Sequence, residues 1–172
     1  DPAAPTDWNF VTNGTFTAPA TSQFAVTVNG STVAVKTVGF RRRVAYAALN
    51  QRDLRIDNAL FLELGSAVPE GATVEVKNPS GALWPASFSF KSAASANRYN
   101  PAIHVNQEGY VPNLAKKAMI GYYLGNLGEL DVAATAGFKL INAATGATVH
   151  TGTLVPRRET GYVYSPQPYQ KV

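Results

Sequence analysis

The chain has 172 residues, of which 45% are hydrophobic and only 15% are charged, and it contains no cysteine. Low charge together with many apolar residues excludes a disordered chain, and the lack of cysteine excludes disulfides and thiolate metal sites. The net charge of +4 is small, and the one dense basic cluster is the run of three arginines at 41–43. We therefore expect no nucleic-acid partner. No apolar run reaches the ~18 residues of a membrane span, so we expect no membrane insertion.

The chain begins Asp1-Pro2-Ala3-Ala4-Pro5. A Pro/Ala/Thr-rich start of this kind is typical of a processed, exported protein or of a linker between secreted modules. The same composition is found where a chain has been trimmed at a linker. We expect a secreted, extracellular protein.

The first half of the chain alternates apolar and polar residues, with turn residues between the runs. Asn29-Gly30 joins two β-branched runs and predicts a type I′ hairpin, because both turn positions need positive φ. Residues 91–97 are rich in Ser and Ala and are interpreted as a linker. The expected strands are 24–28, 31–38, 41–47, 59–64, 72–77 and 83–90.

The strand pattern restarts after this linker. We expect strands at 103–105, 117–124, 137–142 and 147–154, with another beginning in 161–165. Residues 44–55 and 126–136 fit either a strand or a helical turn. Strands at this spacing are typical of a sandwich or barrel, and the pattern predicts two all-β modules, 1–97 and 98–172. The second is short for a sandwich of about 100 residues, so we expect it to lack its last strands.

The acidic residues do not form a catalytic pair. Glycosidases need two carboxyl groups that face each other across the substrate, whereas the 11 acids here are scattered. Asp53 and Asp57 are four residues apart in an Arg-rich stretch, where we expect salt bridges with Arg52 and Arg55. Residues 53–58 are too poor in acids for an EF-hand loop, and an irregular calcium site is left open.

The other catalytic signals are also missing from the sequence. His104 and His150 are far apart and lack metal-ligand spacing. There is no glycine-rich phosphate loop after a strand and no Gly-x-Ser-x-Gly nucleophile elbow. We predict no catalytic residues, no metal site and no cofactor, and hence no enzyme activity for this chain.

Aromatic side chains are the remaining candidates for a function. The chain has 2 Trp, 8 Tyr and 8 Phe. Amphipathic aromatic rings pack against the apolar C–H groups of sugars. We take Trp8, Tyr46, Trp84 and Tyr99 as candidate carbohydrate-binding residues. Core packing is the competing interpretation for each of them.

Three motifs in the second module carry a family resemblance. Residues 103–112 read IHVNQEGYVP and resemble the motif Val-Asn-Gln-x-Gly-Tyr-x-Pro that opens the immunoglobulin-like domain preceding the catalytic barrel of family 9 glycoside hydrolases. Residues 116–120 (KKAMI) and 138–146 (FKLINAATG) resemble the next two motifs of that domain, in the same order. In the first module, residues 68–76 are more loosely similar to bacterial immunoglobulin-like repeats.

The first motif also makes physical sense as a turn. Asn106 and Gln107 are suited to hydrogen-bond a turn backbone, Gly109 allows positive φ, and Pro112 ends the turn. In the family this motif is a folding signature and has no catalytic role. We therefore expect a structural role for it here.

The resemblance implies an all-β chain of two tandem immunoglobulin-like β-sandwich modules, 1–97 and 98–172. The family's last strands and its catalytic acids would follow Val172. The implied function is that of a non-catalytic accessory region of a secreted, cellulase-like β-glucanase, supporting a covalently linked catalytic domain.

Other functions stay open at this point. One alternative is a carbohydrate-binding module, mainly residues 1–97, that binds plant cell-wall β-glucans through exposed aromatic residues. Another is adhesion by tandem immunoglobulin-like units. An open sheet edge in an incomplete module would also allow oligomerisation.

Overall fold

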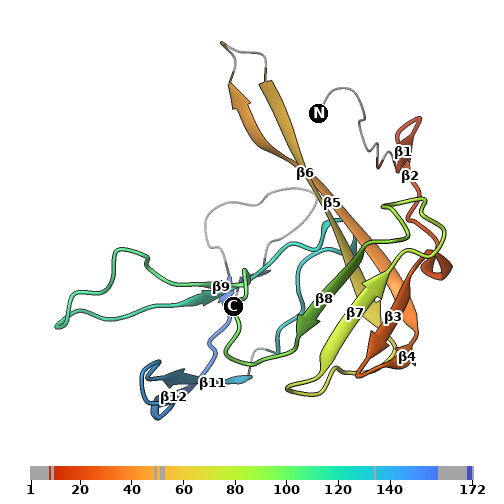
Figure 1. Cartoon of the computed structure of the whole chain (residues 1–172). Coiled ribbons are helices and arrows are strands. Elements are labelled where there is room, and N and C mark those ends of the chain that lie inside the picture. The colour runs from red at the N-terminus through yellow and green to blue at the C-terminus, as the bar shows by residue number, and fades with distance from the viewer. Residues whose placement is uncertain are drawn as a thin grey trace. The chain divides into compact units, whose positions relative to one another are not determined.

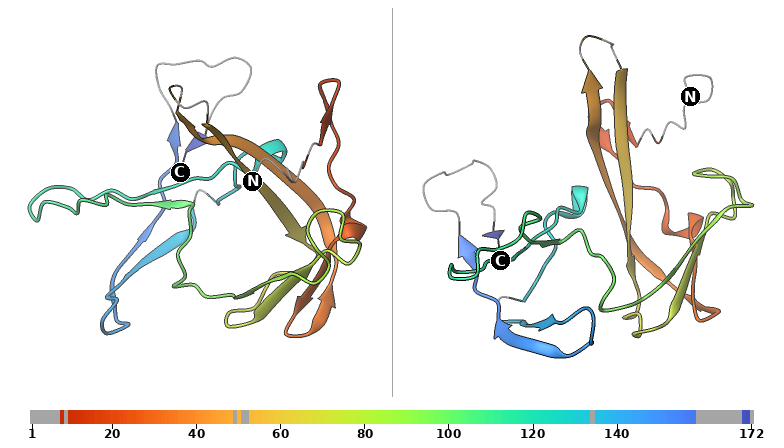
Figure 2. Two further views of the ribbon diagram at one scale, coloured as in Figure 1. Left: turned by 45° about the horizontal axis from the view of Figure 1, so that its top comes forward. Right: turned by 60° about the vertical axis from the view of Figure 1, so that its left-hand side comes forward.

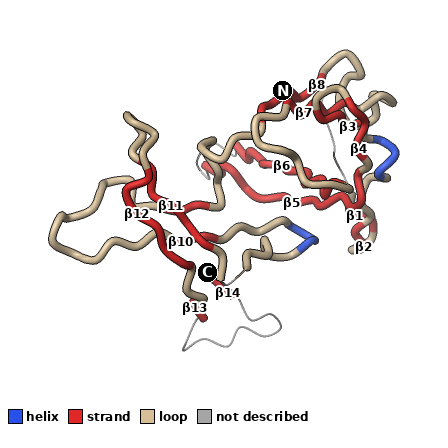
Figure 3. The backbone as a smooth tube through the Cα atoms, turned by 90° about the horizontal axis from the view of Figure 1, so that it is seen from below, coloured by secondary structure: helices blue, strands red, loops and turns tan. Residues whose placement is uncertain are grey.

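The computed structural model describes residues 8, 10–48, 50, 53–133, 135–158 and 170–171. Its regular structure is almost entirely β-strand, with two short 3-10 helices, η1 (Thr21–Gln23) and η2 (Gly125–Leu127), drawn in blue in Figure 3. The prediction of an all-β fold is confirmed, and the several antiparallel sheets are consistent with an immunoglobulin-like sandwich. The described residues fall into two compact units, one within 1–99 together with Leu124–Gly128, the other within 100–123 and 129–172.

The first unit packs its two main antiparallel sheets against each other, and β1 and β2 form a further short pair. The larger sheet has the strand order β4-β3-β7-β8, and the smaller one is the long hairpin β5–β6. Figure 1 shows that this hairpin extends past the strands of the larger sheet. The strand bounds are β1 (Val11–Thr12), β2 (Thr15–Phe16), β3 (Ala25–Val28), β4 (Ser31–Val33), β5 (Val35–Ala48), β6 (Asp53–Leu64), β7 (Thr73–Lys77) and β8 (Ser89–Ala93).

The predicted Asn29-Gly30 hairpin is confirmed. Asn29 and Gly30 have φ values of 50° and 82°, and the turn brings Val28 opposite Ser31. The same dipeptide at Asn13-Gly14 has φ values of 51° and 76° and joins β1 to β2. That second hairpin was not predicted, although it has the same sequence signal.

Two expected strands of the first unit have different bounds in the structure. The expected strand 31–38 is interrupted at Ala34, whose carbonyl accepts the Gly65 N–H at 2.7 Å, and the chain passes there from one sheet to the other. The open segment 44–55 is strand at Val44–Ala48 and from Asp53 onwards, with Asn50 in a turn between them. Within it, the ladder pairs Val44 with Ile56.

The expected strand 83–90 is wrong for residues 83–88. Its first residues form turns, in which Leu83 N–H donates to Asn78 Oδ1 at 2.8 Å and Phe88 N–H donates to the Pro85 carbonyl at 2.9 Å. Pro85 has no N–H for a ladder, which disfavours a strand here. Strand β8 starts only at Ser89, and it takes in the first three residues of the segment interpreted as a linker.

The core of the first unit lies between its two sheets. Phe24, Val26, Val38 and Leu83 form the buried cluster. The leucines of β6 pack against it from one side and the valines of β7 from the other, because alternate residues of a strand share a face. The side chain of Asn78 is also fully buried, and its amide donates to the Gln23 carbonyl at 2.7 Å.

The second unit consists of short antiparallel pairs, with β11 pairing β12 as the longest among its described residues. Figure 2 shows this hairpin as a separate two-stranded ribbon. The expected strand 117–124 is strand only at Met119–Ile120, followed by a single β-bridge between Tyr123 and Glu129. The expected strand in 161–165 lies outside the described residues. The strand bounds are β9 (Ile103–His104), β10 (Met119–Ile120), β11 (Gly137–Ile141), β12 (Thr148–Thr153), β13 (Arg157–Arg158) and β14 (Gln170–Lys171).

Candidate functional site

The VNQEGY motif forms a turn that its own side chains hold in place. Asn106 Oδ1 accepts the N–H of Glu108 at 3.0 Å, and Gly109 follows with a φ of 97°. The Tyr110 hydroxyl accepts the Asn106 N–H at 3.1 Å and donates to the Lys117 carbonyl. The structural role expected for Asn106 and Gly109 is therefore confirmed. The hydroxyl of Tyr110 is a contribution that the sequence analysis missed.

A lysine side chain closes the loop that follows this motif. Lys116 Nζ donates to the carbonyls of Val111 at 3.0 Å and Leu114 at 2.8 Å, and also to that of Pro112. One ammonium group thus gathers three carbonyls, which uses all of its N–H donors. Lys116 belongs to the second family-like motif, so the first two motifs are joined by this contact.

The third motif is another side-chain-stabilised turn. Asn142 Oδ1 accepts the N–H groups of Ala144 at 2.9 Å and Thr145 at 3.2 Å. Gly146 ends the turn with a φ of 71°. Such an Asx turn fixes the reversal between β11 and β12. The side chains of the motifs that resemble the family thus stabilise turns.

Apolar side chains of the second unit are largely exposed. Among its described residues, Ala102 is the only buried hydrophobic residue. On the β11–β12 hairpin, Leu140 is 58% exposed and Val149 is 59% exposed. Contiguous exposed apolar patches mark interaction sites, and these side chains are the candidates for such a patch in the second unit. We call the set Ile103, Val105, Val111, Leu114, Leu140 and Val149 the apolar surface of the second unit.

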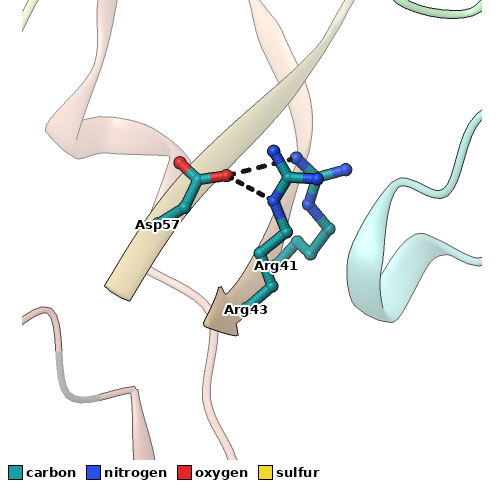
Figure 4. Close-up of polar contacts among 3 residues, drawn as sticks. All are labelled: Arg41, Arg43 and Asp57. Atoms are coloured by element: carbon teal, nitrogen blue, oxygen red, sulfur yellow. Dashed lines mark hydrogen bonds and ion pairs between the residues drawn. The ribbon is translucent and has the colours of Figure 1, made fainter. Parts of the chain in front are cut away.

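The arginine run at 41–43 lies in the middle of β5, opposite β6. Figure 4 shows one carboxylate oxygen of Asp57 facing two of these arginines, with Oδ2 at 2.8 Å from Arg43 Nε and 3.7 Å from Arg41 Nη2. Arg42 lies on the other face of the strand, where its Nε donates to Asn58 Oδ1 at 2.9 Å. The sequence analysis expected Asp57 to pair with arginines near it in sequence, whereas the hairpin supplies partners from the opposite strand.

Two of the four candidate sugar-binding residues come together. The rings of Trp8 and Trp84 have centroids 6.5 Å apart, and both residues pack against the core cluster while remaining partly exposed. Their indole N–H groups donate to backbone carbonyls, Trp8 to Leu83 at 2.8 Å and Trp84 to Phe88 at 3.2 Å. These N–H groups are therefore already used within the first unit.

The other two candidates lie in different surroundings. Tyr46 is 49% exposed on the outer part of the β5–β6 hairpin, with the Arg55 guanidinium 5.5 Å from its ring centroid. Tyr99 is 85% exposed. The carbohydrate-binding role of these four residues stays a prediction.

Glu75, on β7, is surrounded by groups that change its pKa. A hydrogen bond from the Ser89 hydroxyl lowers the pKa of Glu75 below its ordinary value. Partial burial opposes this shift, and Lys77 and Lys91 lower the pKa further.

His104 Nε2 lies 2.9 Å from the Gly121 carbonyl. Within the described residues, no group of three or more His, Asp or Glu side chains is placed to hold a metal ion, and no helix has the length and apolarity to cross a membrane.

Comparison with known proteins gives one family match, which covers much of the second half of the chain. No curated protein and no solved structure matches significantly. Residues 98–169 match the family model described as the cellulase N-terminal ig-like domain. This span contains all three motifs described above, and the resemblance to the immunoglobulin-like domain of family 9 glycoside hydrolases is confirmed for this part of the chain.

Proposed function

We propose that this chain is a non-catalytic amino-terminal region of a secreted, cellulase-like β-glucanase, and that residues 98–169 support a covalently linked family 9 catalytic domain. The match to the cellulase N-terminal ig-like domain carries this proposal. The substrates of the parent enzyme would then be cellulose and related β-glucans.

The apolar surface of the second unit is consistent with this role. Leu140 and Val149 come from opposite strands of one hairpin and are both more than half exposed. Burying such side chains against another domain contributes about 25 cal/mol per Å² of apolar area. A catalytic domain that covers this surface would stabilise the ig-like domain and would be stabilised by it.

The test compares the gene product that contains this chain with a version from which residues 98–172 are deleted. We expect the deletion to lower both the thermal midpoint of the catalytic domain and its rate of cellulose hydrolysis. The double variant Leu140→Ser/Val149→Ser should reproduce part of this loss. Lys139→Ser, in the same strand, is the control and should have no effect.

Two results would contradict the proposal. One is a gene product that carries no family 9 catalytic domain. The other is a catalytic domain whose midpoint and rate are the same with and without residues 98–172.

A further inference from the structure

The first unit contains an apolar cavity of about 440 Å³ between its two sheets. Strand β6 contributes Leu60, Leu62 and Leu64 to one wall, and β3, β7 and β8 contribute apolar side chains to the other. The three leucines are only partly buried although they point into the sandwich. The described side chains thus leave space between the sheets, and its volume lies within the ~300–1,000 Å³ of ligand sites.

The wall of this cavity offers few hydrogen-bonding groups. Trp8 and Trp84 line it, but their indole N–H groups donate to the backbone. Among the described residues that line the cavity, Asn58 is the only one with a polar side chain apart from the two indoles. A sugar would bury several hydroxyl groups here without partners, which is costly for each hydroxyl. The cavity therefore suits an apolar molecule.

A positive charge lies at the edge of the cavity. Arg42 Nε donates to Asn58 Oδ1 at 2.9 Å, and Arg42 Nη2 donates to the Trp8 carbonyl at 2.6 Å. Since Asn58 and Trp8 both line the cavity, these two bonds hold the guanidinium at its rim. They use two of the five guanidinium N–H donors.

The charge of Arg42 is not neutralised by the nearby carboxylate. Asp57 forms its ion pairs with Arg41 and Arg43, which project from the opposite face of β5 because neighbouring residues of a strand alternate. No ion pair to Arg42 is found in the described part of the chain. The guanidinium of Arg42 at the rim therefore has N–H donors that can bind an anion.

We propose that this cavity binds a small amphipathic carboxylate, whose alkyl or aryl body lies between the sheets and whose carboxylate pairs with Arg42. Removal of the apolar body from water supplies most of the affinity. The planar guanidinium matches the geometry of a carboxylate and selects it over neutral or cationic head groups. This ligand class is independent of the function proposed for the second unit.

The chain carries its own reporter for this site. Its 2 tryptophans, Trp8 and Trp84, both line the cavity, so a ligand that enters changes the tryptophan emission. The full chain is titrated with decanoate as the alkyl probe, with cinnamate (followed by calorimetry) as the aryl probe, and with decyltrimethylammonium as the cationic match of decanoate. We expect saturable binding of at least one carboxylate, and binding of the cation weaker by about tenfold or more. Whichever of decanoate and cinnamate binds with the higher affinity shows whether the cavity prefers an alkyl or an aryl body.

Two arginine variants locate the carboxylate. Arg42→Gln should weaken carboxylate binding by about tenfold, whereas the neighbouring Arg43→Gln, on the opposite face, should leave it unchanged. Leu62→Phe fills part of the cavity and should weaken both carboxylates. The circular dichroism spectrum checks that each variant is folded.

Several outcomes would overturn the proposal. The first is that neither decanoate nor cinnamate binds saturably. The second is that decyltrimethylammonium binds with the same affinity as decanoate. The third is that Arg42→Gln and Arg43→Gln change carboxylate binding equally. The comparison of probe charges uses the unchanged chain, so it remains decisive even where a variant does not fold.

Discussion

Gly125 lies directly against the backbone of Phe40, so that a Cβ atom at Gly125 would stand 1.9 Å from the Phe40 carbonyl oxygen. The next residue fixes this approach, because Asn126 Oδ1 accepts the Phe40 N–H at 2.7 Å. Leu127 fills the space beside Gly39 in the same way. The segment Leu124–Gly128, which lies within the family-matched span, thus packs against strand β5 as part of the first unit.

Gly125→Ala should destabilise the first unit strongly. The new methyl group overlaps a backbone carbonyl that cannot rotate away, and the φ of +67° adds strain. We expect a loss of more than about 3 kcal/mol in the free energy of unfolding. Gly71→Ala is the control, since Gly71 has a φ of +77° but nothing within 4 Å of its Cβ position, and it should cost only about 1–2 kcal/mol. Urea unfolding measures both, and equal losses would show that the contact with Phe40 is not tight.

Asn78→Ala should remove the anchor of the turn before β8. The buried amide of Asn78 donates to Gln23 O and to Ser80 Oγ, and its carbonyl oxygen accepts Leu83 N–H. Its loss leaves buried backbone groups without partners, at a cost of about 2–4 kcal/mol. Asn97→Ala, at an exposed position, is the comparison. If the two variants have the same thermal midpoint, the turn does not depend on Asn78.

The sequence predicts local features of this fold better than distant ones. Asn29-Gly30 and the Asn106–Gly109 turn are specified by residues that are adjacent in the chain, and both were predicted from backbone preferences alone. The delayed start of β8 follows from local turns, in which Leu83 N–H donates to Asn78 and Phe88 N–H donates to Pro85. The break at Ala34 depends on Gly65, which is far away in sequence. Alternation alone does not reveal such a long-range partner.

The candidate site shows the same division. The aromatic content of the first module was evident from the sequence. Whether Trp8 and Trp84 face solvent or the interior depends on how the β5–β6 hairpin covers the larger sheet, and on the carbonyls that their indoles reach. The charge of Arg42 at the cavity rim follows from cross-strand pairing with Asn58, which residue spacing does not give.

Tyr110→Phe should loosen the motif turn of the second unit. The hydroxyl joins Asn106 N–H to the Lys117 carbonyl, and phenylalanine keeps the ring but breaks both hydrogen bonds. Because the site is partly exposed, water replaces some of the loss, and we expect about 1–2 kcal/mol. The measurement is amide hydrogen exchange at Asn106, which should become faster. Tyr99→Phe should leave that exchange rate unchanged, and an unchanged rate in Tyr110→Phe as well would argue against the bridge.

Trp84→Ala and Tyr99→Ala should separate packing from sugar binding. Trp84 packs against Phe24, Trp8 and Phe90, so its removal should cost about 2–4 kcal/mol of stability. Tyr99 is exposed, and its removal should leave the thermal midpoint within about 1 °C. Sedimentation with insoluble cellulose then tests binding. If Trp84→Ala stays fully stable while it loses cellulose binding, Trp84 is a sugar platform and the packing interpretation is wrong.

Glu75→Gln should change how stability depends on pH. The pKa of Glu75 is lowered in the folded chain, first by the Ser89 hydroxyl and then by Lys77 and Lys91, relative to an ordinary value of 4.5. A carboxyl group of this kind stabilises the fold above its ordinary pKa, and the contribution is lost as the pH falls through the lowered folded value. At neutral pH, we therefore expect a lower thermal midpoint for Glu75→Gln than for the unchanged chain, with the two midpoints converging at acid pH.

The ionic part of this effect can be separated by salt. Added salt screens Lys77 and Lys91, whose Nζ atoms lie 3.4 Å and 3.9 Å from the Glu75 carboxylate, but it leaves the Ser89 hydrogen bond in place. The difference between the midpoints at neutral pH should therefore shrink with salt without disappearing. Ser89→Ala should remove the part that survives. A difference that salt abolishes completely would mean that the lysines alone lower the pKa of Glu75.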